Sequence, residues 1–134
     1  MIHLFDTNAV SALVHHRRNY ERLAAIVDSL DLEERLLSTI TLSEIETMVA
    51  KAKDPSSKVI KVRLILSHFN IVDFGEHAAA HAGQIRAYLE PLGQSIGPLD
   101  ALIAAHAKSL AAIVVTDNVK EFSRVPQLKI LNWR

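Results

Sequence analysis

Three acidic residues each follow a short apolar run of the kind that forms a buried strand: Asp6, Glu44 and Asp117. In an open parallel sheet, the carboxyl ends of the strands lie along one edge, and ligands bind there. We therefore expect these three carboxylates to meet at one edge of a sheet. Clustered carboxylates repel one another unless a cation lies among them.

A fourth acid, Asp100, lies near the start of a largely apolar stretch that runs from Leu99 to Ala107. The pattern predicts a helix buried on most sides, with no Lys or Arg within one turn of Asp100. A buried, unpaired carboxylate is costly, so Asp100 also favours a bound cation. Oxygen ligands without cysteine select Mg²⁺ or Mn²⁺ rather than zinc. Such an ion can orient a phosphodiester, lower the pKa of an attacking water and stabilise the leaving oxygen.

Each acid also has a purely structural explanation. Asp6 and Asp117 are residues that cap turns, and Glu44 could complete a capping box with Thr41. Asp100 could simply complement the dipole of its helix. The four acids together, three of them at strand ends, favour a metal-dependent phosphoryl-transfer site.

The composition indicates one domain covering residues 1–134. Hydrophobic residues make up 49% of the 134, enough for a substantial core, and no linker or repeat divides the chain. The absence of cysteine excludes disulfides and thiolate zinc sites and suits a reducing compartment, so we expect a cytoplasmic protein. No secretory signal precedes the first strand, and no apolar run approaches the roughly 20 residues that span a bilayer.

The formal net charge is zero, with 15 basic and 15 acidic residues. A neutral total provides no long-range attraction to nucleic acid, so any polyanion would have to bind a local patch. Arg17–Arg18, or Lys58 and Lys61 with Arg63, could form one. For each cluster alone, a solvated helix face is the expected explanation.

The elements that must position the acids alternate along the chain. Apolar runs predict strands over 2–5, 36–40, 71–74, 113–115 and 128–131. Helical spacing and capping signals predict helices over about 8–16, 19–29, 41–53, 56–69, 76–89 and 98–110, with a last turn before Pro126. Short strands separated by helices, without hairpin signals, predict an α/β fold with a mainly parallel sheet.

Several segments, in this order, resemble PIN-domain ribonucleases of the VapC type, the toxins of VapBC toxin–antitoxin pairs. They are Leu4–Asn8, Ile40–Glu44, Gly83–Ala87, Ile96–Asp100 with Ile103–Ala107, and Val115–Asn118 with Glu121–Phe122. The resemblance covers nearly the whole chain, including the ending Leu128–Trp133. It implies a three-layer α/β/α fold and a Mg²⁺- or Mn²⁺-dependent endoribonuclease that cleaves structured RNA, tRNA or rRNA.

The resemblance also implies a VapB-type antitoxin that blocks the site, commonly a homodimer, and a larger assembly with the antitoxin. Carried over by position, the core metal-binding and catalytic acids are Asp6, Glu44 and Asp100. Family members place the fourth acid variously within residues 116–121, so Asp117 and Glu121 are both candidates, and strand-end geometry slightly favours Asp117. The supporting polar residues are Thr7, Asn8, Thr116 and Asn118.

The chain departs from the family pattern at one position. The family often has glycine four residues after the second acid, where this chain has Met48, and Glu46 adds an acid that we expect to face solvent. Two other functions stay open: a catalytically silent PIN-like binding module and a haloacid-dehalogenase-like phosphatase. The phosphatase chemistry needs an acid two residues after the first, where this chain has Asn8.

Overall fold

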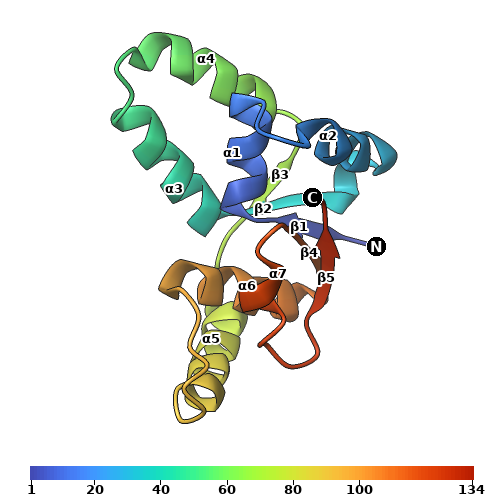
Figure 1. Ribbon diagram of the computed structural model, residues 1–134, viewed down its shortest axis with the longest axis vertical. Coiled ribbons are helices and arrows are strands. Elements are labelled where there is room, and N and C mark those ends of the chain that lie inside the picture. Colours follow the sequence, from blue (N-terminus) through green and yellow to red (C-terminus); the bar gives the residue numbers. More distant parts are fainter.

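A five-stranded sheet runs through the centre of the protein, with helices on both faces (Figure 1). The computed structural model describes all residues from Met1 to Arg134. The strands are β1 (His3–Phe5), β2 (Arg35–Ser38), β3 (Asn70–Val72), β4 (Ile113–Thr116) and β5 (Lys129–Asn132). The helices are α1 (Thr7–His15), α2 (Tyr20–Ser29), α3 (Thr39–Ala50), α4 (Pro55–Leu66), α5 (Glu76–Leu89), α6 (Pro98–Leu110) and α7 (Val119–Phe122), with a 3-10 turn at Leu32–Glu34.

All strand pairs are parallel, and the strand order is β3-β2-β1-β4-β5. The chain winds outward from β1 to β3 and then returns to place β4 on the other side of β1. The winding direction therefore reverses between β1 and β4, and in such sheets the ligand crevice lies beyond the carboxyl ends of the strands at that point. Asp6 and Asp117 directly follow these two strands.

Successive strand residues pack into two separate cores because side chains alternate between the faces of a sheet. Phe5, Leu37 and Val115 join the core beneath α1 to α4, whereas their neighbours Leu4, Leu36 and Val114 join the core beneath α5 to α7. Both faces are covered, which explains why the strands are apolar throughout. The expected three-layer α/β/α architecture is confirmed.

The boundary between β2 and α3 differs from the expectation. The strand predicted over 36–40 ends at Ser38, and α3 begins at Thr39. Ser38 caps the helix, since its hydroxyl accepts a hydrogen bond from the backbone N–H of Ile40 at 3.0 Å. The predicted capping box of Thr41 and Glu44 is therefore wrong: the β-branched residues Thr39, Ile40 and Thr41 continue the strand pattern but already belong to the helix. Glu44 consequently lies in the second turn of α3.

Helices α3 and α4 form an angled pair that extends away from the sheet beside α1 (Figure 1). Met48 lies on the inner side of α3, partly buried against the α1 core. Its Sδ lies 3.4 Å from Nε2 of His15 at the end of α1. The side chain that replaces the family's glycine therefore fills space between α1 and α3, and Glu46 is exposed, as expected. No helix is both long and apolar enough to cross a bilayer.

Candidate active site at the carboxyl ends of β1 and β4

Asp6 is buried at the carboxyl end of β1. It caps α1, accepting a hydrogen bond on Oδ1 from the backbone N–H of Ala9 at 2.9 Å. Its Oδ2 accepts a second bond from the hydroxyl of Thr116 at 2.5 Å. Only 1% of Asp6 is exposed, so the carboxylate is fixed by one contact from its own helix and one from the end of β4.

Glu44 approaches the site from α3. The Thr7 hydroxyl donates to Oε1 of Glu44 at 2.5 Å and also lies 3.3 Å from the hydroxyl of Thr41. Because Thr7 directly follows Asp6, this contact ties the second acid to the residue beside the first. Thr7 therefore holds Glu44 in place in the structure, and its role in supporting the chemistry of the site stays a prediction.

Asp100 and Glu121 share one hydrogen-bond donor. The side-chain amide of Asn118 donates to Oδ2 of Asp100 at 3.1 Å and to Oε2 of Glu121 at 2.6 Å. Glu121 also accepts a bond on Oε1 from the backbone N–H of Gly97, at 3.3 Å, just before α6 begins. The turn after β4 and the start of α6 are therefore joined through these two acids.

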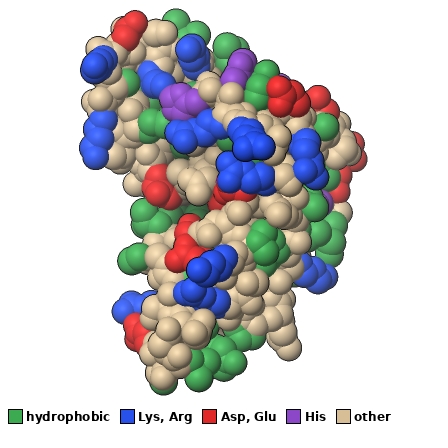
Figure 2. All heavy atoms as spheres, in the orientation of Figure 1, with side chains coloured by type: hydrophobic (Ala, Val, Ile, Leu, Met, Phe, Trp, Pro, Cys, Tyr) green, Lys and Arg blue, Asp and Glu red, His purple; other side chains and the backbone are tan.

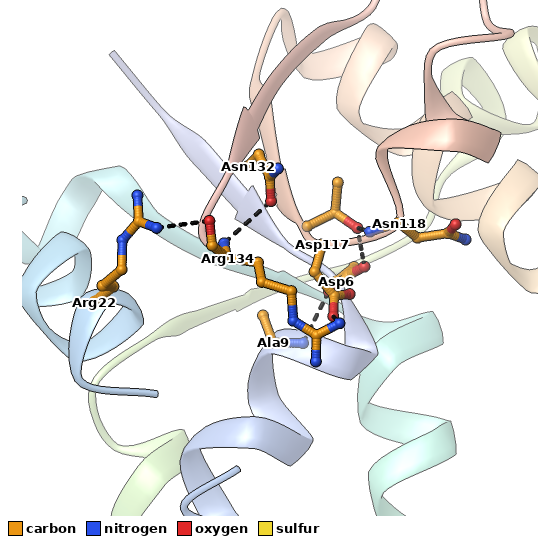
Figure 3. A network of polar contacts seen from close by, with 8 residues as sticks. Asp6, Ala9, Arg22, Asp117, Asn118, Asn132 and Arg134 are labelled. Atoms are coloured by element: carbon orange, nitrogen blue, oxygen red, sulfur yellow. Dashed lines mark hydrogen bonds and ion pairs between the residues drawn. The ribbon is translucent and has the colours of Figure 1, made fainter. Parts of the chain in front are cut away.

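Asp117 has a different partner. Its Oδ2 lies 3.7 Å from Nη1 of Arg134, whose backbone carbonyl accepts a bond from Arg22 at 2.7 Å (Figure 3). Arg134 is also held through its N–H by the Asn132 side chain, at 3.1 Å. The residues after β5 thus place a positive charge against Asp117. The sequence pattern had no signal for this pairing, since Arg134 belongs to no motif and lies 17 positions from Asp117.

Burial and the neighbouring acids disfavour the charged forms of Asp6 and Asp100. Desolvation by burial raises the pKa of Asp6 to about 7, against the opposing hydrogen bonds from Thr116 and Ala9, and the charges of Asp100 and Asp117 add to the rise. Desolvation likewise raises the pKa of Asp100 to about 6, with a further contribution from Glu121. The Asn118 hydrogen bond instead lowers the pKa of Glu121. A nearby cation would reverse the repulsion between these groups.

A cleft of about 330 Å³ is lined by two of the acids, Glu44 and Asp100, whereas Asp6, Asp117 and Glu121 are not among its lining residues. Glu44 stands on one side and Asp100 on the other, and the remaining lining residues are Thr7, Asn8, Gly97, Pro98 and Leu99. The donors are carboxylate, hydroxyl and amide oxygens, the set that suits Mg²⁺ or Mn²⁺. No three acidic or histidine side chains are grouped tightly enough to ligate one ion directly. The donors therefore fit an ion that keeps several waters and takes one or two carboxylates, as Mg²⁺ usually does.

A buried Ser–His pair behind the cleft was absent from the sequence-based expectations. Nδ1 of His106 lies 2.8 Å from the Ser38 hydroxyl, and the His106 ring packs edge-on against Phe74. Ser38 caps the helix that carries Glu44, and His106 lies on the helix that carries Asp100. The pair therefore connects the two walls of the site from below. Nothing in the spacing of His106 from Asp100 along the sequence indicated this contact.

The fold and the site define a class of protein: a three-layer α/β/α domain with acids at the point where the strand order reverses. Several protein families share this arrangement. The PIN domain family model matches residues 4–128. The chain is 37% identical to the tRNA(fMet)-specific endonuclease VapC of Salmonella typhimurium over 130 residues, which cover 97% of this chain and 96% of the relative.

Solved structures agree in fold over the full length. VapBC2 from Rickettsia felis, bound to a DNA fragment from the promoter, matches with a TM-score of 0.89 and 32% identity, covering 100% of both chains. VapBC-1 from nontypeable Haemophilus influenzae matches with a TM-score of 0.88 and 31% identity, covering 99% of this chain and 98% of that one. The chain belongs to the PIN-domain family and, within it, to the VapC ribonucleases.

Proposed function

We propose that this protein is the toxin of a VapBC-type toxin–antitoxin pair and an endoribonuclease that requires Mg²⁺ or Mn²⁺. The observation that supports this most directly is the group of acids at the cleft: burial raises the pKa values of Asp6 and Asp100, and Asp100 lines the cleft together with Glu44. Carboxylates that only stabilise a fold are usually paired with a cation or exposed. Neither Asp6 nor Asp100 forms an ion pair with a cation, and neither is exposed.

In the proposed reaction, water adds to the phosphorus of an RNA phosphodiester, one P–O bond breaks, and a proton passes to the leaving oxygen. A bound Mg²⁺ or Mn²⁺ supplies orientation of the phosphate, a lower pKa for the attacking water and stabilisation of the leaving oxygen. One or two of Asp6, Glu44 and Asp100 would bind the ion directly and the others through its water molecules, with Glu121 or Asp117 as the fourth acid. Because Thr116 and Thr7 each donate to one of these acids and Asn118 donates to two, the carboxylates are positioned before any substrate arrives.

We propose structured RNA as the substrate, because the Salmonella typhimurium relative is a tRNA(fMet)-specific endonuclease. A VapB-type antitoxin is the proposed partner, since the matching structures from Rickettsia felis, Salmonella typhimurium and Haemophilus influenzae are VapBC assemblies. A homodimer within a larger toxin–antitoxin assembly is the proposed state. The family assignment leaves the phosphatase alternative without support.

The decisive experiment measures cleavage of a labelled tRNA(fMet) transcript and of a ribosomal RNA fragment with Mg²⁺, with Mn²⁺ and with EDTA. Wild-type protein should cleave one of them only with a divalent ion, and Asp100→Asn should abolish cleavage while remaining folded. Glu44→Gln and Glu46→Gln form a matched pair on one helix, of which only the first should lose activity. Undiminished cleavage in EDTA would refute metal dependence.

Calorimetric titration with Mn²⁺ separates the enzyme from a silent binding module. The wild type should bind Mn²⁺, and Asp6→Asn and Asp100→Asn should each weaken this binding by about tenfold or more, whereas Glu46→Gln should not. Absence of both Mn²⁺ binding and RNA cleavage in the folded wild type would favour the non-catalytic module.

A further inference from the structure

Two groups of basic residues that are 40 positions apart in the sequence lie together in the structure. Nζ of Lys58, at the start of α4, donates to Nδ1 of His15, at the end of α1, at 3.3 Å. The positive charges of Lys58, Arg17 and Lys61 all act on His15, whose pKa is lowered first by burial and then by these three neighbours. The two local clusters seen in the sequence are therefore one surface, with Arg17 from the first and Lys58 and Lys61 from the second.

This surface, which we name the basic patch, consists of His15, His16, Arg17, Lys53, Lys58 and Lys61. Lys61 borders both hollows of the patch, one shared with His15 and His16 and the other with Lys53 and Lys58. The ion pairs of the protein are Met1–Glu34, Arg86–Glu90 and Arg134–Asp117. No cation of the patch is therefore paired with an acid.

One acid, Asp54, lies beside the patch without forming an ion pair with it. Asp54 lines the same hollow as Lys53 and Lys58. Its carboxylate caps α4, accepting from the backbone N–H of Ser57 at 3.4 Å. Like charges held together without counter-charges are unfavourable, so the patch is best explained by an anionic partner that the free protein lacks.

The patch is linked to the acid cleft by the contacts between α1 and α3. Thr7, Ser11 and His15 are spaced i, i+4, i+8 and so form one stripe along α1. Thr7 contacts Glu44 at one end of this stripe, and His15 contacts Met48, one turn further along α3, at the other. From Asp6 to His15 the rise along the helix is about 14 Å. A nucleic-acid strand whose scissile phosphate lies in the cleft would reach the patch within a few nucleotides.

Figure 2 shows the same arrangement on the surface: Lys, Arg and His side chains gather over the upper half of this face, above a hollow that contains acidic side chains. Because the protein has no net charge, a polyanion would have to be attracted by a local surface such as this one rather than by the molecule as a whole. We propose that the basic patch binds the sugar–phosphate backbone of the RNA strand flanking the cleavage point. This inference rests on the proposed function.

The test uses Lys58→Gln/Lys61→Gln, with Arg63→Gln/Lys129→Gln as a control of equal charge change. Arg63 lies on α4 about 200° around the helix from Lys61, and Lys129 lies on β5, so both are exposed away from the patch. Binding of a fluorescein-labelled tRNA transcript is followed by anisotropy in EDTA, which prevents cleavage, over a range of salt concentrations.

Losing two phosphate contacts should reduce the slope of log K against log salt by about 1.4 to 1.8 and weaken binding by roughly 25- to 60-fold at 0.1 M salt. The control should keep the wild-type slope. With Mn²⁺, the patch variant should raise KM for the cleaved RNA with little change in kcat, because the acids are untouched. Arg17→Gln should produce about half of the change in slope.

Three results would overturn the inference. If the wild type binds and cleaves RNA but the patch variant keeps its salt slope and KM, the patch is not an RNA surface, and the proposed function stands. If the patch variant keeps RNA binding but no longer binds a VapB-type antitoxin, the patch belongs to the protein partner. If the folded wild type neither binds nor cleaves RNA, the inference and the proposed function both fail.

Discussion

The Thr116 hydroxyl donates a hydrogen bond to the Asp6 carboxylate at 2.5 Å, joining residues 110 positions apart at the ends of two adjacent parallel strands. This single contact opposes the desolvation that raises the pKa of Asp6. The strand order makes the contact possible, because β4 returns beside β1 where the winding of the sheet reverses. The charge state of the buried acid therefore depends on a neighbour that only the tertiary fold supplies.

Thr116→Val should destabilise the protein by about 1.5 to 3 kcal/mol at pH 8, because the ionised Asp6 loses a charge-assisted hydrogen bond while staying buried. Urea denaturation in EDTA measures the change. Thr47→Val is the control: the Thr47 hydroxyl donates to a carbonyl within α3 at an exposed position, and the loss there should be within about 0.5 kcal/mol. Equal losses in the two variants would contradict the role given to Thr116.

The stability of the metal-free protein should fall as pH rises from about 4 to about 7. In this range the unfolded chain has lost the Asp6 proton while the folded protein, in which the pKa is about 7, retains it. Folded protein then binds more protons, so the free energy of unfolding decreases with pH, by up to about 4 kcal/mol. Above pH 7 the decrease should level off.

Asp6→Asn should remove most of this dependence, whereas Asp28→Asn, at an exposed position on α2, should keep it. Urea denaturation midpoints across the pH range, in EDTA, measure both. Adding Mn²⁺ to the wild type at pH 8 should raise its midpoint, because an ion that binds only the folded protein stabilises it. A wild-type profile that matches Asp6→Asn would show that Asp6 does not titrate in this way.

Glu121→Gln should weaken Mn²⁺ binding and RNA cleavage more than Asp117→Asn. Glu121 shares the Asn118 amide with Asp100, whereas Asp117 faces the positive charge of Arg134. The sequence-based preference for Asp117 stays a prediction, and these contacts favour Glu121 instead. Calorimetry with Mn²⁺ decides between them: we expect about a tenfold or greater loss of affinity for Glu121→Gln, and a larger loss for Asp117→Asn would restore the original preference.

His106→Ala should destabilise the protein by about 2 to 4 kcal/mol, since it leaves a cavity and removes the partner of the buried Ser38 hydroxyl. His77→Ala, at an exposed position on α5, should change stability by less than about 0.5 kcal/mol. Burial lowers the pKa of His106, so the neutral ring contributes to the stability of the fold at neutral pH. This contribution is lost as pH falls below about 6.5, where the unfolded chain takes up the proton first. Thermal melts at pH 8 and pH 5 measure both effects.

The sequence by itself determined the alternation of strands and helices, because buried parallel strands and amphipathic helices have different hydrophobic periods. It also marked Asp6, Glu44 and Asp100 through family-like segments. It misplaced the start of α3, because the residues after Ser38 have the composition of a strand, and the cap that ends the strand depends on a single hydroxyl.

The tertiary structure alone decided which hydrogen bonds hold the acids and which basic side chains lie near them. The donors to the acids, Thr116, Thr7 and Asn118, were expected only as polar support, since a hydrogen bond depends on distances of a few tenths of an ångström that spacing along the chain does not specify. The pairing of Asp117 with Arg134, and the union of Arg17 with Lys58 and Lys61 in one patch, likewise depend on how the β5 end and α4 pack. Local sequence sets which groups are present, and long-range packing sets which of them meet.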